Sequence, residues 1–371
     1  MLKQHIPSST AFRTCKGRYA EMGQTIPNQE LNLVAGEIVE VRSRQEILAT
    51  LDEKGMLDHM PFMPEMLQYC GKRFRVFKKA HKTCDNIQDW SMRRVEHAVH
   101  LTGVRCDGRA HGNCDAGCMI FWREVWLKRV DTNLLNESLI CPVETSVSDN
   151  PLSSLPVVNC SVEKLHAAAC SSVGPSSADS LYTCQATELR KFTSHLSDWD
   201  LRQYLRDILS GNLSRGIAES KSEKLLEMML GTLEIFRSLL ILVFNKLQGV
   251  RKGVQYPHIE GALVTTPTAE LKLNPGEFVQ VKSKAEILAT LDRRNRNRGL
   301  LFDSEMVKYC GGTFRVLKRV YQIVDERTGK MMPMKSPCIV LEGVACASDY
   351  HRLCPRAIYH YWRESWLSRI E

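Results

Sequence analysis

Three cysteines and a histidine lie within thirteen residues of this sequence, at Cys106, His111, Cys114 and Cys118, and Cys84 precedes them. Zinc takes four nitrogen or sulfur ligands in a tetrahedron, and thiolates in a short loop supply such ligands. The glycines between these residues let the backbone turn around a small ion. The pattern predicts a metal site, with zinc favoured over an iron–sulfur cluster and over metal-free or redox-active thiols.

An altered version of this motif lies 240 residues later. It keeps two cysteines and the histidine, and it lacks equivalents of Cys84 and Cys118. The retained candidate ligands are Cys346, His351 and Cys354. Cys338 is a candidate replacement for a lost sulfur, although about 26 Å of straight strand would separate it from Cys346.

Two sets of metal ligands remain open at this point. In the first set, Cys84 joins the three cysteines of the loop. The second set uses the C-x4-H-x2-C-x3-C loop alone, and His360 or Cys184 would complete its later version. A bond from Cys184 would clamp the middle of the chain to the second motif.

The two motifs belong to a longer internal repeat. The segment "LNLVAGEIVEVRSRQEILATLD" (31–52) matches "LKLNPGEFVQVKSKAEILATLD" (271–292), and the match continues without a gap. Between 31–130 and 271–370, 38 of 100 aligned positions are identical. We therefore expect two copies of one domain.

Each copy has mainly the sequence pattern of β-strands. In the first copy, alternation of apolar and polar residues predicts strands near 36–41, 74–80, 99–104 and 119–127. Short helical turns are expected at 45–52 and 64–69, with Ser43 as an N-cap and Gly71 after the second turn. In the second copy, residues 328–330 predict a hairpin turn.

Short strands with one or two helical turns in about 100 residues favour a small closed barrel. The piece "YCGKRFRVFKKAHKTCD" (69–85) resembles part of an SH3-like barrel, including those of nitrile hydratase β subunits. The resemblance concerns architecture and implies no activity. The expected fold class is α+β, with two homologous SH3-like β-barrel domains joined by a helical spacer.

The expected domain boundaries follow from the repeat and from composition. We expect an N-terminal extension (1–30), a first barrel (31–130), a Ser/Pro-rich linker (131–180), a helical segment (181–255) and a second barrel (256–371). Within the helical segment, apolar residues at 201, 204, 205, 208 and 209 predict an inward-facing stripe. Charges interrupt the apolar residues of the helix at 219–248, so we do not expect it to span a membrane. We expect it to be buried on most sides, and the alternative is a helix that lies on a membrane surface or in the groove of a partner.

A tryptophan-rich motif, Trp-Arg-Glu-x-Trp, occurs in both copies. If it forms one strand, its two tryptophans and its glutamate share a face and could bind a ligand. The alternative is that the tryptophans close the core and the charged residues pair with their neighbours. The candidate ligand-binding residues are Trp122, Glu124, Trp126, Trp362, Glu364 and Trp366.

Composition narrows the function only slightly. The chain of 371 residues has a net charge of +8 and 14 cysteines, and it shows no secretory signal, so we expect a cytoplasmic location. No common catalytic motif is present. The favoured hypothesis is a zinc-stabilised, non-enzymatic binding or scaffold protein with a protein partner. A metalloenzyme or redox protein and a nucleic-acid-binding protein are the alternatives.

Overall fold

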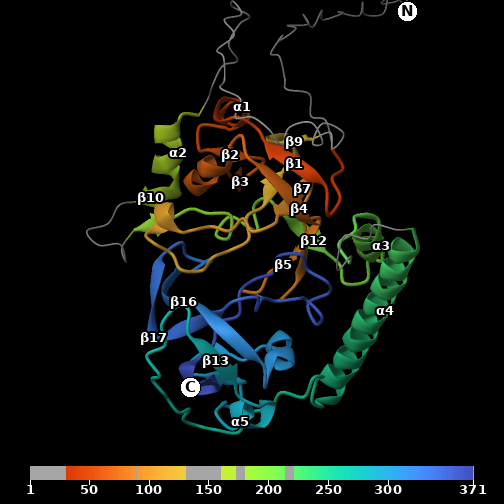
Figure 1. Ribbon diagram of the computed structural model, residues 1–371, viewed down its shortest axis with the longest axis vertical. Helices are drawn as coiled ribbons and strands as arrows, with labels where there is room; N and C mark the ends of the chain where they lie inside the picture. Colours follow the sequence, from red (N-terminus) through yellow and green to blue (C-terminus); the bar gives the residue numbers. More distant parts are fainter. Residues whose placement is uncertain (1–30, 88–89, 131–159, 173–179, 214–220, 371) are drawn as a thin grey trace, which may run out of the picture.

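The computed structural model describes residues 31–87, 90–130, 160–172, 180–213 and 221–370. It is a mixed α+β structure, mostly sheets with few helices, and it contains two similar strand-rich regions (Figure 1). We call residues 31–130 region 1, residues 271–370 region 2, and residues 160–172 with 180–213 the spacer. In this part of the chain, no helix is both long and apolar enough to cross a membrane.

Region 1 contains a five-stranded antiparallel sheet in the order β8-β7-β4-β1-β9. Its strands are β1 (Ile38–Val41), β4 (Arg73–Lys79), β7 (Ala98–Leu101), β8 (Trp122–Arg123) and β9 (Leu127–Arg129). The other elements are α1 (Arg44–Leu48), β2 (Met56–Leu57), β3 (Met60–Pro61), β5 (Lys82–Cys84), β6 (Met92–Arg94), and the 3-10 helices η1 (Pro64–Tyr69), η2 (Arg109–His111) and η3 (Glu124–Trp126).

Region 2 contains a four-stranded sheet in the order β17-β16-β13-β18. Its elements are β13 (Phe278–Val281), α5 (Lys284–Leu288), β14 (Arg296–Asn297), β15 (Leu300–Leu301), η5 (Ser304–Tyr309), β16 (Thr313–Val324), β17 (Met331–Leu341), η6 (Glu364–Trp366) and β18 (Leu367–Arg369). Its strand registers repeat those of region 1: Val39 faces Phe74, and Val279 faces Phe314.

Local sequence signals explain several of these elements. The Ser43 hydroxyl accepts from the Glu46 backbone N–H, and the Glu46 carboxylate accepts from the Ser43 backbone N–H. The predicted N-cap at Ser43 is therefore confirmed, and Glu46 completes a capping box that fixes the start of α1. The predicted helical turn at 64–69 is confirmed as η1, and Gly71 follows it with a φ of +74°.

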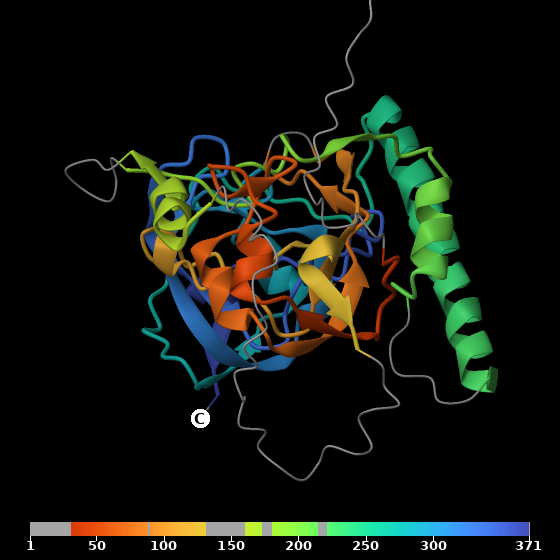
Figure 2. The ribbon, with the colours of Figure 1, turned by 90° about the horizontal axis from the view of Figure 1, so that it is seen from above.

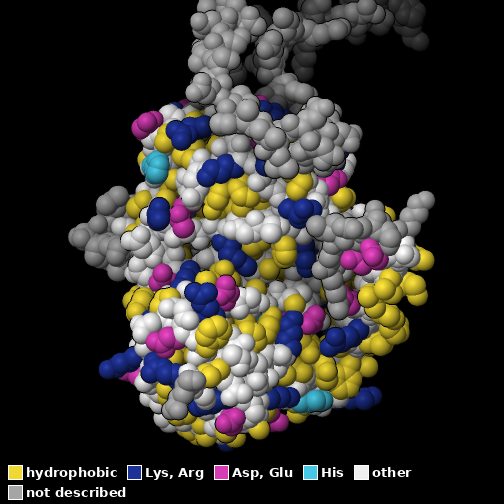
Figure 3. All heavy atoms as spheres, in the orientation of Figure 1, with side chains coloured by type: hydrophobic (Ala, Val, Ile, Leu, Met, Phe, Trp, Pro, Cys, Tyr) yellow, Lys and Arg dark blue, Asp and Glu magenta, His cyan; other side chains and the backbone are white. Residues whose placement is uncertain are grey.

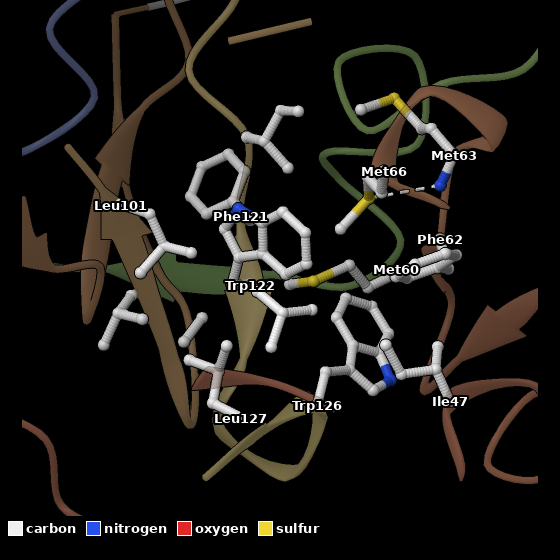
Figure 4. Packing of buried hydrophobic residues seen from close by; sticks show 14 of the residues in the cluster. Ile47, Met60, Phe62, Met63, Met66, Leu101, Phe121, Trp122, Trp126 and Leu127 are labelled. Carbon is white, nitrogen blue, oxygen red and sulfur yellow. Dashed lines mark hydrogen bonds between the residues drawn. The ribbon is translucent and has the colours of Figure 1, made fainter. Parts of the chain in front are cut away.

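The Trp-Arg-Glu-x-Trp motif lies in the core of each region. Trp122 and Trp126 are fully buried, and Phe62 meets both rings edge-on (Figure 4). The Trp126 indole donates to the Thr50 hydroxyl, and Trp366 does the same with Thr290. The predicted single strand at 119–127 is wrong, because η3 separates β8 from β9.

The glutamates of this motif bind the backbone that precedes the first strand of each region. Glu124 accepts from the backbone N–H groups of Asn32 and Leu33, and Glu364 accepts from those of residues 271, 272 and 273. Both glutamates are buried. A carboxylate that receives several backbone hydrogen bonds stabilises the chain at that point. Together with the buried tryptophans, these contacts give the motif a packing role.

The spacer packs on region 1 and also contacts region 2, where the Tyr182 backbone N–H donates to the Gly329 carbonyl oxygen and Asp198 pairs with Arg352. The spacer comprises α2 (Val162–Ala169), β10 (Cys170–Ser172), β11 (Leu181–Tyr182), β12 (Ser194–Leu196) and α3 (Arg202–Leu209). Strand β12 extends the small sheet of β5 and β6, and Leu165 of α2 enters the core of region 1. Helix α2 lies inside the segment that was expected to be a linker. It is held on region 1 because its Leu165 side chain is buried in the core of that region. The expected segment 1–30 lies outside the described residues.

Helix α3 is turned differently from the prediction. Of the apolar stripe, Tyr204 is buried, but Leu201, Leu205 and Leu209 are exposed. The buried residues include Asp207, which forms an ion pair with Lys82 of β5, and both side chains are completely inaccessible to solvent. Turning the leucines inward would separate this pair and leave a buried charge without its partner, which is strongly destabilising.

Helix α4 (Lys221–Arg251) runs along the outside of the molecule beside α3 (Figures 1 and 2). The expectation that this helix is buried on most sides is wrong. Its inner face holds Ile235, Ser238 and Gly231, whereas eleven large apolar residues on its other faces are exposed. Apolar side chains accordingly cover the edge of the molecule where α4 lies (Figure 3).

Buried histidines give region 1 a predicted dependence on pH. Burial lowers the pKa of His81 and of His100 to about 3. In the unfolded chain a histidine titrates near pH 6.5, so the unfolded state binds more protons as the pH falls below that value. Above pH 6.5 these histidines therefore do not reduce the free energy of unfolding. At pH 5 each of them should lower that free energy by about 2 kcal/mol.

The His100→Asn variant tests this dependence. Asparagine keeps an N–H donor for the Ile120 carbonyl oxygen, which the His100 ring contacts at 2.8 Å. Urea unfolding measures the free energy of unfolding at pH 7.5 and at pH 5. The decrease between these two pH values should be smaller by about 2 kcal/mol in the variant than in the natural chain. An equal loss in the variant and in the natural chain would contradict the assignment.

Candidate metal sites

In region 1, a glutamate, a cysteine and a histidine come together. Ligand atoms of Glu65, Cys106 and His111 all lie within 4.8 Å of one another. The Nδ1 atom of His111 is 2.6 Å from Oε1 of Glu65, and the Cys106 thiol lies 3.7 Å from the same oxygen. We call these three residues cluster 1.

Three different elements bring the residues of cluster 1 together. Glu65 lies on η1, Cys106 follows the bridge between Arg105 and Met119, and His111 ends η2. Gly108 and Gly112 flank η2 with φ angles of +72° and +61°. These left-handed turns, which glycine adopts without strain, return the loop toward η1.

Gly108 provides a test of this loop. A Cβ atom at this position would lie 2.0 Å from the carbonyl oxygen of Cys114, which is a backbone atom. The Gly108→Ala variant should therefore shift the loop that carries His111 and lower the stability of the chain by at least 1 kcal/mol. Urea unfolding would measure the loss. Gly103→Ala is the control for the left-handed φ alone, because nothing lies within 4 Å of a Cβ atom there, and equal losses in the two variants would contradict the steric argument.

The imidazole of His111 is oriented as a ligand would be. Its Nε2 lies 3.0 Å from the carbonyl oxygen of Thr183 in the spacer. Since a carbonyl oxygen only accepts, Nε2 carries a proton, and Nδ1 points to Glu65. Metal-bound histidines commonly donate their second N–H to a backbone carbonyl in this way. Both nitrogens are engaged, so His111 is poorly placed to act as a base toward Cys106.

Region 2 contains the corresponding cluster 2. Ligand atoms of Glu305, Cys346 and His351 also lie within 4.8 Å of one another. His351 Nδ1 is 3.5 Å from the Cys346 sulfur and 4.0 Å from Oε1 of Glu305, while His351 Nε2 is 3.5 Å from Asp303. The left-handed turns recur as well, at Ser348 with a φ of +66° and at Arg352 with a φ of +53°.

The electrostatics of the two glutamates differ. Burial opposes ionisation of Glu65, but the hydrogen bond and the charge of His111 outweigh this effect and hold the Glu65 pKa below its usual value. Burial raises the pKa of Glu305. His351 opposes this effect, but at 4.0 Å its attraction to the Glu305 carboxylate is too weak to outweigh the burial. Burial also raises the pKa of Cys106 and Cys346. A bound cation would oppose each of these burial effects.

One atom of each cluster lacks a partner. The second carboxylate oxygen, Oε2, of Glu65 is buried without a hydrogen bond, and so is Oε2 of Glu305. A buried carboxylate oxygen without a partner is costly. The equivalent oxygen lacks a hydrogen-bond partner in both regions, so each cluster has one unsatisfied acceptor.

The other two cysteines of the loop at 106–118 line a cavity beside cluster 1. This cavity has a volume of ≈ 40 Å³, and Cys106 and His111 lie on its wall. Three further thiols line it, from Cys114, Cys118 and Cys184. Cys184 packs against the core of region 1 and does not join the donor atoms of cluster 2.

Three predicted ligands, Cys84, Cys114 and Cys354, bridge the regions instead of joining a cluster. The backbone N–H of Cys84 in region 1 donates to the Cys354 sulfur in region 2 at 3.3 Å. At the equivalent positions, the N–H of Val324 donates to the Cys114 sulfur, also at 3.3 Å. This reciprocity is the pattern of an isologous interface.

Cys338 lies apart from the other predicted ligands. It faces Val320 across the β16–β17 pair, is fully buried and contacts Arg363 at 3.4 Å. Of the nine predicted metal ligands, the structure thus gathers Cys106 with His111 and Cys346 with His351. It adds Glu65 and Glu305, which the sequence marks only as repeated acids.

Comparison of the chain with protein-family models, with curated proteins and with solved structures gave no match.

Proposed function

We propose that this protein is a zinc-binding scaffold, in which two SH3-like barrels of common origin each hold one zinc ion through glutamate, cysteine and histidine. The observation that carries the proposal is the recurrence of one donor set. Glu65, Cys106 and His111 reappear at an offset of 240 residues, and both sets converge within 4.8 Å.

The donor chemistry favours zinc. Zinc accepts thiolate, imidazole and carboxylate ligands together, whereas an iron–sulfur cluster is held mainly by cysteines. Around a tetrahedral zinc ion, neighbouring donors lie about 3.3–3.8 Å apart. The separations of 3.5 and 4.0 Å in cluster 2 are close to this range. In cluster 1, an ion would replace the hydrogen bond between His111 and Glu65.

A scaffold role fits the position of the clusters. Glu65 and His111 are buried, and each cluster fixes its loop to the 3-10 helix η1 or η5. Zinc at such a site would lock the loop without requiring a large core. The locked surfaces would then be available to a protein partner.

The metal content of the full chain tests the proposal. Protein purified anaerobically and without chelators should contain about two zinc ions per chain by mass spectrometry of the metal. Protein that remains folded and contains no zinc, even after incubation with excess zinc and gel filtration, would refute it.

The thiol-lined cavity supports a second candidate function. Four cysteines line this cavity, although of these only Cys106 belongs to a group of donor atoms within 4.8 Å of one another, so a four-thiolate metal or redox centre in region 1 would need the other sulfurs to move closer. A metal bound only by sulfur, or an iron–sulfur absorption spectrum, would favour this alternative.

A further inference from the structure

The exposed side of α4 carries a heptad repeat. Leucine occupies every seventh position, and a second apolar residue follows each leucine after three positions. In the usual notation the leucines are the a positions and the others are the d positions of four heptads. The a residues are Leu226, Leu233, Leu240 and Leu247, and the d residues are Met229, Phe236, Val243 and Val250.

All eight residues are exposed to solvent in the single chain. Their exposed fractions run from 41% for Val243 to 86% for Val250. The opposite side of the helix is the one that packs inward, through Gly231 and Ile235. An apolar a/d stripe sustained over four heptads is the sequence of a coiled coil, and here it has no partner among the described residues.

We infer that α4 pairs with α4 of a second copy of this chain in an antiparallel coiled coil. Residues 226–250 span about 37 Å of helix, at about 1.5 Å per residue. If position 226 faces position 250 of the partner, every a leucine meets a d residue. The resulting layers pair Leu226 with Val250, Leu233 with Val243, Leu240 with Phe236 and Leu247 with Met229.

Charge favours the antiparallel orientation. In that arrangement, Arg251 at an e position lies near position 223 of the other copy and not near a second basic residue. Arg237 lies near Arg237 of the other copy, which is one like-charge contact per dimer. A parallel pair would instead place Lys246 beside Arg251 twice, which is a like-charge contact.

Among the described residues, no other helix is as long as α4, and the neighbouring α3 packs only on its inner side. The helix has a self-complementary stripe, so a second copy is the occupant that fits it.

Sedimentation equilibrium of the full chain tests the inference. At about 20 µM the natural chain should have twice its monomer mass of 42.2 kDa. The double variant Leu233→Glu with Leu240→Glu should be monomeric and retain the circular dichroism of a folded chain, with dimerisation weakened more than about 100-fold. The control Val264→Glu changes a residue that is 90% exposed and lies outside α4, and it should remain dimeric.

Cysteine cross-linking tests the orientation. Mixed Leu226→Cys and Val250→Cys chains should form a disulfide-linked dimer, whereas Leu226→Cys alone should not exceed the background of the natural chain. Cross-linking of Leu226→Cys with itself would overturn the antiparallel assignment. A monomeric natural chain, a dimer unaffected by the double variant, or a monomer that instead binds lipid vesicles through α4 would overturn the inference.

Discussion

The Cys106→Ser variant is expected to contain about one zinc ion per chain in place of two, and Cys346→Ser is expected to show the same loss. Each cysteine supplies the only thiolate of its cluster. A serine hydroxyl is a much poorer zinc ligand, because it is not ionised at neutral pH. The double variant should retain no zinc after gel filtration in the presence of a weak chelator.

The chain contains a matched pair of controls for this experiment. Cys70 and Cys310 are equivalent positions in the two regions, both are partly buried, and neither belongs to a cluster. Serine at either position should leave the zinc content at two. If Cys106→Ser and Cys346→Ser also leave it unchanged, the assigned ligands are wrong.

The Asp207→Asn variant should be less stable than the natural chain by about 3 kcal/mol. Lys82 and Asp207 are both inaccessible to solvent, and removing one member of a buried pair leaves the other charge uncompensated. Burial itself lowers the pKa of Lys82 and raises that of Asp207. The variant should therefore show α3 detached from β5 before the regions unfold.

Urea unfolding with fluorescence and amide hydrogen exchange of α3 would measure this effect. The control is Glu40→Gln, which breaks an exposed ion pair with Arg73 at 3.2 Å and should cost less than about 1 kcal/mol. Equal stability of Asp207→Asn and Glu40→Gln would show that the buried pair does not hold the spacer to region 1.

The sequence predicted the elements that depend on local signals. The N-cap at Ser43, the turn that ends at Gly71 and the hairpin before Met331 each depend on neighbouring residues. The repeat also predicted that both regions would share their strands, and the observed registers agree. The SH3-like class of these regions remains a proposal.

Contacts between distant residues could not be predicted in this way. Glu65 reaches His111 across 46 positions, and Cys84 meets Cys354 across 270 positions. Nothing local distinguishes Glu65 from other acids, although its repetition at Glu305 could have been combined with the repeated cysteine and histidine. The orientation of α4 was also misjudged, because the apolar residues of a helix have the same pattern whether they face a core or a second chain.

The central claim is that one cysteine, one histidine and one glutamate bind each zinc ion. X-ray absorption at the zinc edge of the natural chain measures the ligands of both ions directly. We predict an average of about one sulfur at about 2.3 Å and two or three nitrogen or oxygen atoms at about 2.0–2.1 Å. An average of three or four sulfur ligands would contradict the clusters and favour the thiols that line the cavity in region 1.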